Sequence, residues 1–176
     1  MEMRTHIENL ESAGLLQRVS KPVDKDWEIG CMARWIYHGV PEDQRFGILF
    51  EDVSGFDAPV MTAVLGASRH TYAQALGCAP DEIHDRWREA LSHPREPTAV
   101  DDAPVQAVVE TGADASLADV PIPIWTPGKD AGPYVTALVV TKNRETGVQN
   151  MATYRSQVLD DSTIAINLTP GRHGFM

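Results

Sequence analysis

The sequence predicts a mixed α/β or α+β domain followed by the opening strands of an antiparallel barrel or sandwich. Over the first hundred residues, stretches with apolar residues at helical spacing alternate with short β-branched runs, which is typical of helices packed on a sheet. From Tyr134 onwards the chain carries three strand-like segments joined by short turns. The composition changes near residue 115, so we expect one domain at residues 1–115 and a second at residues 116–176.

Capping residues predict where the helices of the first domain begin. The first helix is expected to begin at Thr5, where Glu8 completes a capping box, and to end at Gly14. The second is expected to begin at Asp26, because the apolar residues after it recur at helical spacing until Gly39. Two further helices are expected over residues 68–76 and 80–91.

Short strands are expected between these helices, over residues 15–20, 46–53 and 59–65. The last two are separated by a segment of hairpin length. Prolines mark residues 93–97 as a linker, and another strand is expected over residues 105–110. Pro121, Pro123 and Pro127 then predict an extended, irregular path, because proline offers no amide hydrogen to a sheet.

The last segment carries polar side chains where strands should be apolar. Strands are expected over residues 134–142, 147–159 and 163–168. Asn150 and Arg155 lie in the second of these, and a regular strand would place them on opposite faces, whereas a bulge or a strand end could bring them together. His173 follows the third strand. An amide oxygen and an imidazole nitrogen suit a divalent metal, and arginine suits a phosphate or a carboxylate. Taken alone, such residues are more often ordinary turn or surface residues.

Composition limits the class of protein. The net charge of −10 argues against nucleic acid or an anionic membrane as a partner. No apolar run approaches the roughly 20 residues of a membrane helix, and the N-terminus lacks an apolar signal core. Cys31 and Cys78 are isolated in sequence, so we expect two reduced, buried thiols and a cytoplasmic protein.

Two motifs resemble a known enzyme family. One runs Asp130-Ala-Gly-Pro-Tyr-Val-Thr136, and the other joins Asn150 to Arg155 five residues later. Together they resemble the UbiD family of prenylated-flavin-dependent decarboxylases, and residues 47–60 resemble that family's N-terminal domain. The resemblance spans nearly the whole chain but only the first third or so of a family member. It implies an α/β (α+β) N-terminal domain followed by the start of an antiparallel split β-barrel that binds flavin.

The resemblance also implies roles for individual residues. Arg155 matches the catalytic arginine that meets the substrate carboxylate, and Asn150 and His173 match metal ligands beside the flavin phosphate. The cofactor-binding residues that it implies are Asn150, Ala152, Thr153, Tyr154, Arg155, Arg172 and His173. The implied cofactors are prenylated FMN and Mn²⁺ or a similar divalent metal, with K⁺ as a further candidate ion. The implied reaction is the reversible decarboxylation of an aromatic or α,β-unsaturated carboxylic acid, with CO₂ as the small product.

The family's metal-binding glutamate and further catalytic acids have no match in this sequence. We therefore expect the 176-residue chain to be inactive by itself and to be part of a longer enzyme. The alternative is a non-catalytic accessory subunit or fragment that docks on a partner chain completing the flavin site. An open strand edge predicts a homo-oligomer or such a partner. Lys129 and Asp130 are assigned to loop structure more readily than to a cofactor or substrate role.

Overall fold

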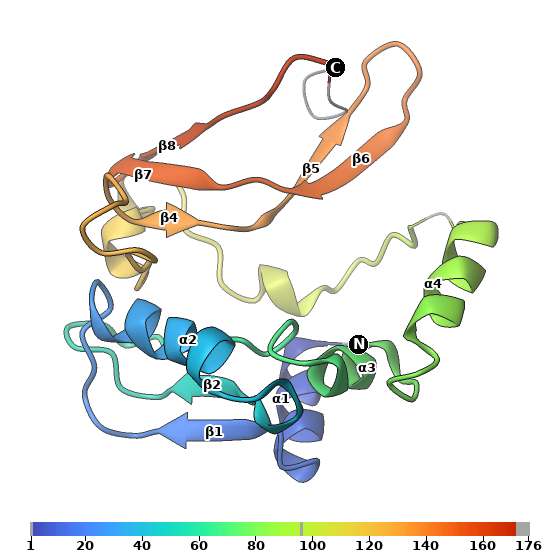
Figure 1. Cartoon of the computed structure of the whole chain (residues 1–176). Coiled ribbons are helices and arrows are strands. Elements are labelled where there is room, and N and C mark those ends of the chain that lie inside the picture. The colour runs from blue at the N-terminus through green and yellow to red at the C-terminus, as the bar shows by residue number, and fades with distance from the viewer. Residues whose placement is uncertain (1, 96, 172–176) are drawn as a thin grey trace.

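The computed structural model describes residues 2–95 and 97–171, which form two three-stranded sheets and a two-stranded sheet, with helices around the first (Figure 1). The first half contains α1 (Met3–Ser12), β1 (Leu16–Val19), α2 (Glu28–Gly39), β2 (Gly47–Phe50), β3 (Val60–Thr62), α3 (Arg69–Leu76) and α4 (Ile83–Ser92). The second half contains β4 (Tyr134–Val135), β5 (Leu138–Lys142), β6 (Gln149–Thr153), β7 (Ser156–Asp160) and β8 (Thr163–Ile166). Short 3-10 turns lie at Glu42–Gln44, Pro104–Gln106, Gly112–Asp114 and Leu117–Asp119.

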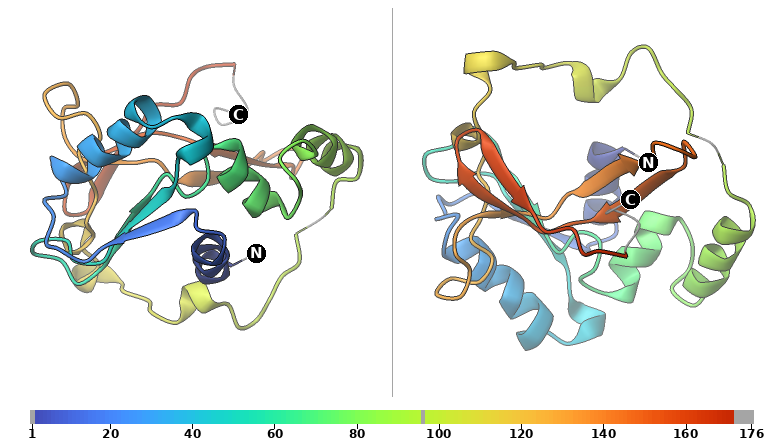
Figure 2. Two further views of the ribbon diagram at one scale, coloured as in Figure 1. Left: turned by 60° about the horizontal axis from the view of Figure 1, so that its bottom comes forward. Right: turned by 90° about the horizontal axis from the view of Figure 1, so that it is seen from above.

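The first sheet has the order β1-β2-β3, with β1 parallel and β3 antiparallel to the central β2. All four residues of β2 are buried, because helices cover both faces of the sheet. Ile48 and Phe50 pack with α2 in one core cluster, and Leu49 packs with Leu10 of α1 in another. Figure 2 shows α1 and α2 on opposite sides of this sheet. The α/β character expected for the first half is therefore confirmed.

The helix starts were predicted with mixed success. The helix expected over residues 68–76 is α3, which Ser68 caps in a reciprocal capping box with Thr71. The predicted starts at Thr5 and Asp26 are wrong: α1 begins at Met3 and α2 at Glu28. At the start of α2 the Glu28 carboxylate accepts the backbone N–H of Asp24. This capping hydrogen bond is therefore made to the backbone of Asp24 and not by the Asp26 side chain.

Two other expectations for the first half are wrong. No strand lies over residues 105–110: Pro104–Gln106 is a 3-10 turn, and Val105, Val108 and Val109 are exposed. A β-branched run forms a strand only when it finds a partner strand, and this segment runs along the outside of the molecule (Figure 2). The two cysteines are free but not buried, since Cys31 is exposed and Cys78 is half-buried.

The second half contains the antiparallel strands that the sequence predicts. β4 pairs with β7 and β5 with β6, and the pairs Val135↔Ser156 and Leu138↔Thr153 keep one register. The predicted strands 134–142 and 147–159 therefore form one long hairpin whose ladder is interrupted at residues 136–137 and 154–155. β8 then pairs with the other edge of β7. Within residues 2–95 and 97–171 these strands form a three-stranded sheet and a two-stranded hairpin but no closed barrel, so the split-barrel expectation is met only in its antiparallel pairing.

The segment before β4 joins the two halves. Ile122 is buried, and Trp125 packs against the core cluster that contains Ile29 and Ile36 of α2. The approach is close: a Cβ atom at Gly30 would lie 2.8 Å from the carbonyl oxygen of Trp125. Glycine is therefore required at position 30 for the second half to reach α2.

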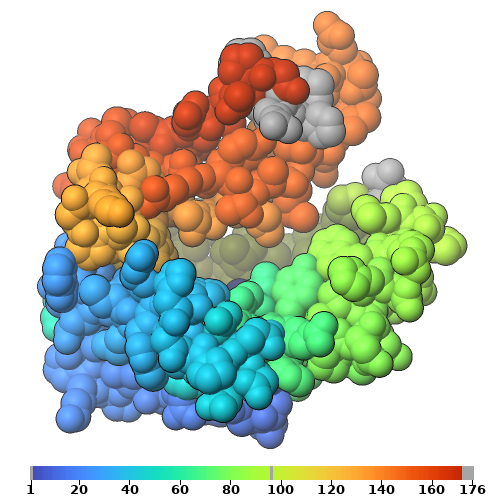
Figure 3. Space-filling view, in the orientation of Figure 1, coloured from blue at the N-terminus to red at the C-terminus, as the bar shows by residue number. Residues whose placement is uncertain are grey.

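The face of the molecule shown in Figure 3 is hollowed between the second sheet and the helices α3 and α4. Part of this hollow is a polar cavity of about 700 Å³ between the β5–β6 hairpin and the segment after α4, lined by Arg95, Pro97, Lys142, Thr146, Gly147, Val148 and Gln149. Among the described residues no helix has the length and apolar character needed to cross a membrane.

Candidate active site

Arg155 lies at the interruption of the long hairpin, between β6 and β7. Its Nη2 atom lies 2.5 Å from Oδ2 of Asp130. Its guanidinium carbon lies 4.0 Å from the centroid of the Tyr134 ring, a cation–π contact. Nε and Nη1 have no hydrogen-bond or ion-pair partner in the part of the chain that the structure describes. Arg155 is thus held at one nitrogen and one face, and its other donors remain free.

Asp130 is the fixed member of this ion pair. Its side chain is 8% exposed, whereas that of Arg155 is 47% exposed. Its Oδ2 accepts the backbone N–H of Thr126 at 2.9 Å, and the backbone N–H groups of Lys129 and Asp130 both return to the Thr126 carbonyl at 3.0 Å. The hydrogen bond from Arg155 is the main reason that the pKa of Asp130 lies below its ordinary value; burial opposes this shift and the Thr126 N–H adds to it.

Three hydrogen bonds hold Tyr134 in place. Its backbone carbonyl accepts the indole Nε1–H of Trp125 at 2.8 Å, and its backbone N–H donates to the Pro123 carbonyl at 3.2 Å. Its hydroxyl donates to Oε1 of Gln157 at 3.3 Å. Since Trp125 packs on the first core cluster, the Tyr134 ring that contacts Arg155 is tied to the core of the first half.

Asn150 lies on β6, five residues before Arg155, and is half-buried. Its Nδ2 donates to Oγ1 of Thr141 at 3.3 Å, and no described residue hydrogen-bonds to its Oδ1. Between Asn150 and Arg155 the hairpin contains a strand end and no inserted residue, because the register is the same on both sides. Asn150 is half-buried and Arg155 exposed, as strand alternation predicts for positions of opposite parity.

The remaining predicted residues lie on β6, directly after it, or outside the residues that the structure describes. Ala152 pairs with Val139 and Thr153 with Leu138, while the backbone N–H of Tyr154 donates to Ala137 at 3.3 Å. β6 pairs with β5 on one edge only, so main-chain groups of its other edge have no strand partner among the described residues. Arg172 and His173 lie outside the described residues.

The residue that sequence reasoning undervalued is Asp130. Its spacing of four residues from Thr126 explains the loop role, and the structure contains that hydrogen bond. Its ion pair with Arg155 joins positions 25 residues apart, so it could not be predicted from the sequence without the fold. For the metal, no group of three or more His, Cys, Asp or Glu side chains suited to an ion occurs in the part of the chain that is described. Asn150 Oδ1 is a suitable oxygen donor and is the only one of the predicted metal ligands that the structure places.

Two family models match the chain. The N-terminal domain of 3-octaprenyl-4-hydroxybenzoate carboxy-lyase (UbiD_N) matches residues 7–91, and the Rift-related domain of the same enzyme (UbiD) matches residues 98–176. A protein of Rhodospirillum rubrum, described as an uncharacterized protein in the cooM 5' region, is 35% identical over 175 residues, which are 95% of this chain and 35% of that protein.

Solved structures show the same similarity. The UbiD-class enzyme HmfF from Pelotomaculum thermopropionicum, in complex with FMN, is 31% identical with a TM-score of 0.84, over 97% of this chain and 37% of HmfF. An evolved dimeric form of HmfF in complex with prFMN gives 30% identity and a TM-score of 0.83, over 95% and 38%. The open form of vanillic acid decarboxylase (ShVdcCD) from Sedimentibacter hydroxybenzoicus gives 28% and 0.79, over 93% and 35%. The chain thus spans 35–38% of the length of these relatives.

Proposed function

Because the chain belongs to the UbiD family, we propose that it forms part of a prenylated-FMN-dependent decarboxylase. The substrate class we propose is an aromatic or α,β-unsaturated carboxylic acid, with CO₂ released or taken up. Neighbours that hold FMN or prFMN support the cofactor. The observation that carries the proposal is the Arg155 guanidinium, held by Asp130 and Tyr134 within the matched Rift-related domain with donors left free.

The proposed role of Arg155 is to bind and orient the substrate carboxylate. Guanidinium offers a planar fork of donors that matches a carboxylate and stays charged at any working pH. The cation–π contact with Tyr134 holds the guanidinium over the ring. Prenylated FMN, when bound, would supply the chemistry of carbon–carbon bond cleavage, which no side chain provides. Arg155 would therefore fix the position of the substrate relative to the cofactor.

Cofactor binding is proposed for β6 and the residues after β8. The unpaired edge of β6 could offer the main chain of Ala152, Thr153 and Tyr154 to the flavin. The free Oδ1 of Asn150 suits Mn²⁺. His173 as a second metal ligand, Arg172 as a phosphate contact and K⁺ as a further ion rest on the family resemblance.

Substitution of Arg155 tests the function. In the enzyme that contains this chain, purified anaerobically with prenylated FMN and Mn²⁺, we expect Arg155→Ala to abolish CO₂ release from a panel of aromatic and acrylic acids. The flavin absorbance of the purified protein should stay close to wild type. Arg155→Lys should also fail, because an ammonium cannot form the two parallel hydrogen bonds of guanidinium.

The matched control is Arg144→Ala in the β5–β6 turn, since Arg144 is exposed and has no ion pair among the described residues. It should keep wild-type turnover. Near-normal turnover of Arg155→Lys would contradict the proposed role of Arg155.

Asn150 and His173 test the metal. If both bind one ion, Asn150→Ala and His173→Ala should each lower Mn²⁺ content and flavin content together. The double variant should then be little worse than either single variant, as for residues that act as a unit. Metal analysis and flavin absorbance measure this, and independent, additive losses would count against a shared ion.

The second candidate is an accessory chain that completes its flavin site with a partner or a second copy. The favouring observation is β8, an edge strand in the described part of its sheet, on which Ile164 and Ile166 are exposed. The neighbour ShVdcCD has been solved with truncated ShVdcD, and HmfF in a dimeric form. Light scattering and flavin titration separate the candidates: an accessory chain binds flavin only with its partner or a second copy, whereas the enzyme that contains this chain binds flavin and releases CO₂ without one.

A further inference from the structure

We propose that Asp130 is a positioning residue for Arg155: it holds one terminal nitrogen of the guanidinium, so that the remaining donors face a carboxylate ligand. The nature of that ligand rests on the proposed function. The positioning itself rests on contacts within this chain.

The ion pair differs from an ordinary surface pair in its asymmetry. Arg86 and Glu89 on α4 are both more than half exposed, so both side chains must be immobilised to meet. The Asp130 side chain, by contrast, is only 8% exposed, and a backbone N–H already fixes its carboxylate. The Arg155 side chain is therefore the part that is ordered by the contact.

Two separate contacts restrain the guanidinium. Its carbon lies 4.0 Å from the centroid of the Tyr134 ring, and its Nη2 atom donates to the Asp130 carboxylate. A cation–π contact alone allows the planar group to rotate over the ring. The carboxylate removes that rotation, and an arginine ordered before a ligand arrives loses less conformational entropy on binding.

A purely structural role for Asp130 makes a different prediction. As a loop residue it needs only an oxygen that accepts the Thr126 N–H, and asparagine provides one. As a positioning residue it needs its negative charge, because the contact with Arg155 is charge-assisted. Asp130→Asn therefore separates the two roles, whereas Asp130→Ala removes both.

The test uses protein labelled with ¹⁵N-arginine. The Arg155 signal is assigned by its loss in Arg155→Lys. In the wild type we expect restricted rotation of its guanidinium group and slow exchange of its protons. Asp130→Asn should abolish the restriction with a smaller fall in Tm than Asp130→Ala, which also loses the bond from the Thr126 N–H. Glu145→Gln is the charge-matched control, since Glu145 lies in an exposed turn and has no ion pair in the described structure.

Benzoate serves as the carboxylate probe, and its binding is followed through the Arg155 signal. Asp130→Asn should weaken binding by about two- to tenfold, the effect of immobilising one flexible side chain, and Glu145→Gln should not. Unchanged restriction of Arg155 in Asp130→Asn would overturn the inference. A fall in Tm of Asp130→Asn that matches that of Asp130→Ala would also overturn it. So would wild-type protein that does not bind benzoate, or Asp130→Asn protein that binds benzoate as tightly as the wild type or more tightly. If the restriction and the benzoate effect hold while the enzyme that contains this chain decarboxylates no acid, the proposed function fails and the positioning role stands.

Discussion

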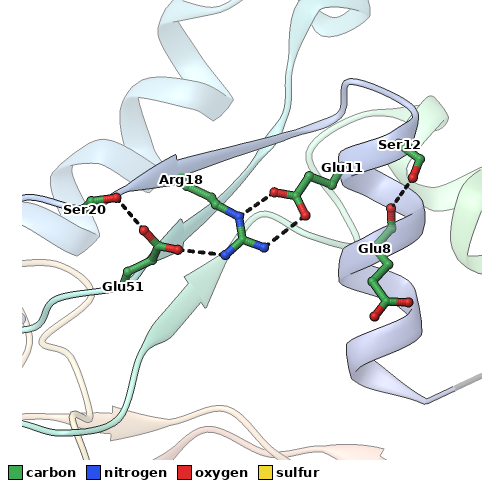
Figure 4. A network of polar contacts seen from close by, with 6 residues as sticks. All are labelled: Glu8, Glu11, Ser12, Arg18, Ser20 and Glu51. Carbon is green, nitrogen blue, oxygen red and sulfur yellow. Dashed lines mark hydrogen bonds and ion pairs between the residues drawn. The ribbon is translucent and has the colours of Figure 1, made fainter.

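At the scale of single residues, Arg18 shows how exposed charges join elements of the first half. Its guanidinium bonds both oxygens of Glu11 on α1, and its Nη1 lies 2.7 Å from Glu51, which also accepts the Ser20 hydroxyl (Figure 4). The hydrogen bond from Arg18 lowers the pKa of Glu11 below 4.5, and those from Ser20 and then Arg18 do the same for Glu51.

This network predicts a pH dependence. Carboxyl groups with lowered pKa values stabilise the folded state above their unfolded pKa, about 4.5, and lose this contribution as the pH falls through their folded values. Arg18→Ala should therefore lose less stability than the wild type between pH 6 and pH 3, although the Ser20 contact retains part of the effect. Urea midpoints across this range measure it. Arg88→Ala, in an exposed pair with Asp85 on one helix, is the control, and parallel pH curves for wild type and Arg18→Ala would refute the prediction.

At the scale of elements, α3 shows what a complete cap contributes. The Ser68 hydroxyl accepts the Thr71 N–H at 3.2 Å, and the Thr71 hydroxyl accepts the Ser68 N–H at 3.0 Å. Because these groups are buried, water cannot replace the lost bonds. We expect Ser68→Ala to lower the free energy of unfolding by about 1–2 kcal/mol, measured by urea denaturation. Ser92→Ala at the exposed end of α4 should cost well under half as much, and equal losses would contradict the role of the cap.

The bounds of α3 were predicted from the sequence to within one residue, whereas its cap at Ser68 was not predicted. Thr5 and Asp26 have side chains suited to capping a helix, but α1 begins before Thr5, at Met3, and α2 begins after Asp26, at Glu28. The valines near residue 108 have strand propensity but no partner strand. In the candidate site, the motif located Asn150 and Arg155, while the pairing of Arg155 with Asp130 depends on how two loops meet. The sequence thus proposes candidate residues, and their contacts come from the fold.

At the scale of the whole molecule, the docking of Trp125 on α2 should hold the two halves together after the chain is cut. The segment with Val105, Val108 and Val109 is exposed, so thermolysin should cleave there first. The two pieces should then elute together in size-exclusion chromatography. In Gly30→Ala they should separate, because the new methyl group would meet the backbone of Trp125 and Ile124. Gly66→Ala, whose methyl group meets only ordinary contacts, is the control, and co-elution of the cut Gly30→Ala protein would contradict the docking.

The contact between Gly30 and Trp125 also has a consequence for the order of events during synthesis. The buried members of the core cluster that receives Trp125 all lie between Val23 and Ala67. During synthesis all of these residues leave the ribosomal exit tunnel before residues 121–125 do. Domains generally fold as units, with the N-terminal domain first, so the cluster can form before Trp125 emerges. The strands from β4 onwards thus emerge beside a surface that is already formed. We expect the nascent first half to act as a template that selects the correct hairpin register and shortens the time for which the strand edges are exposed to aggregation.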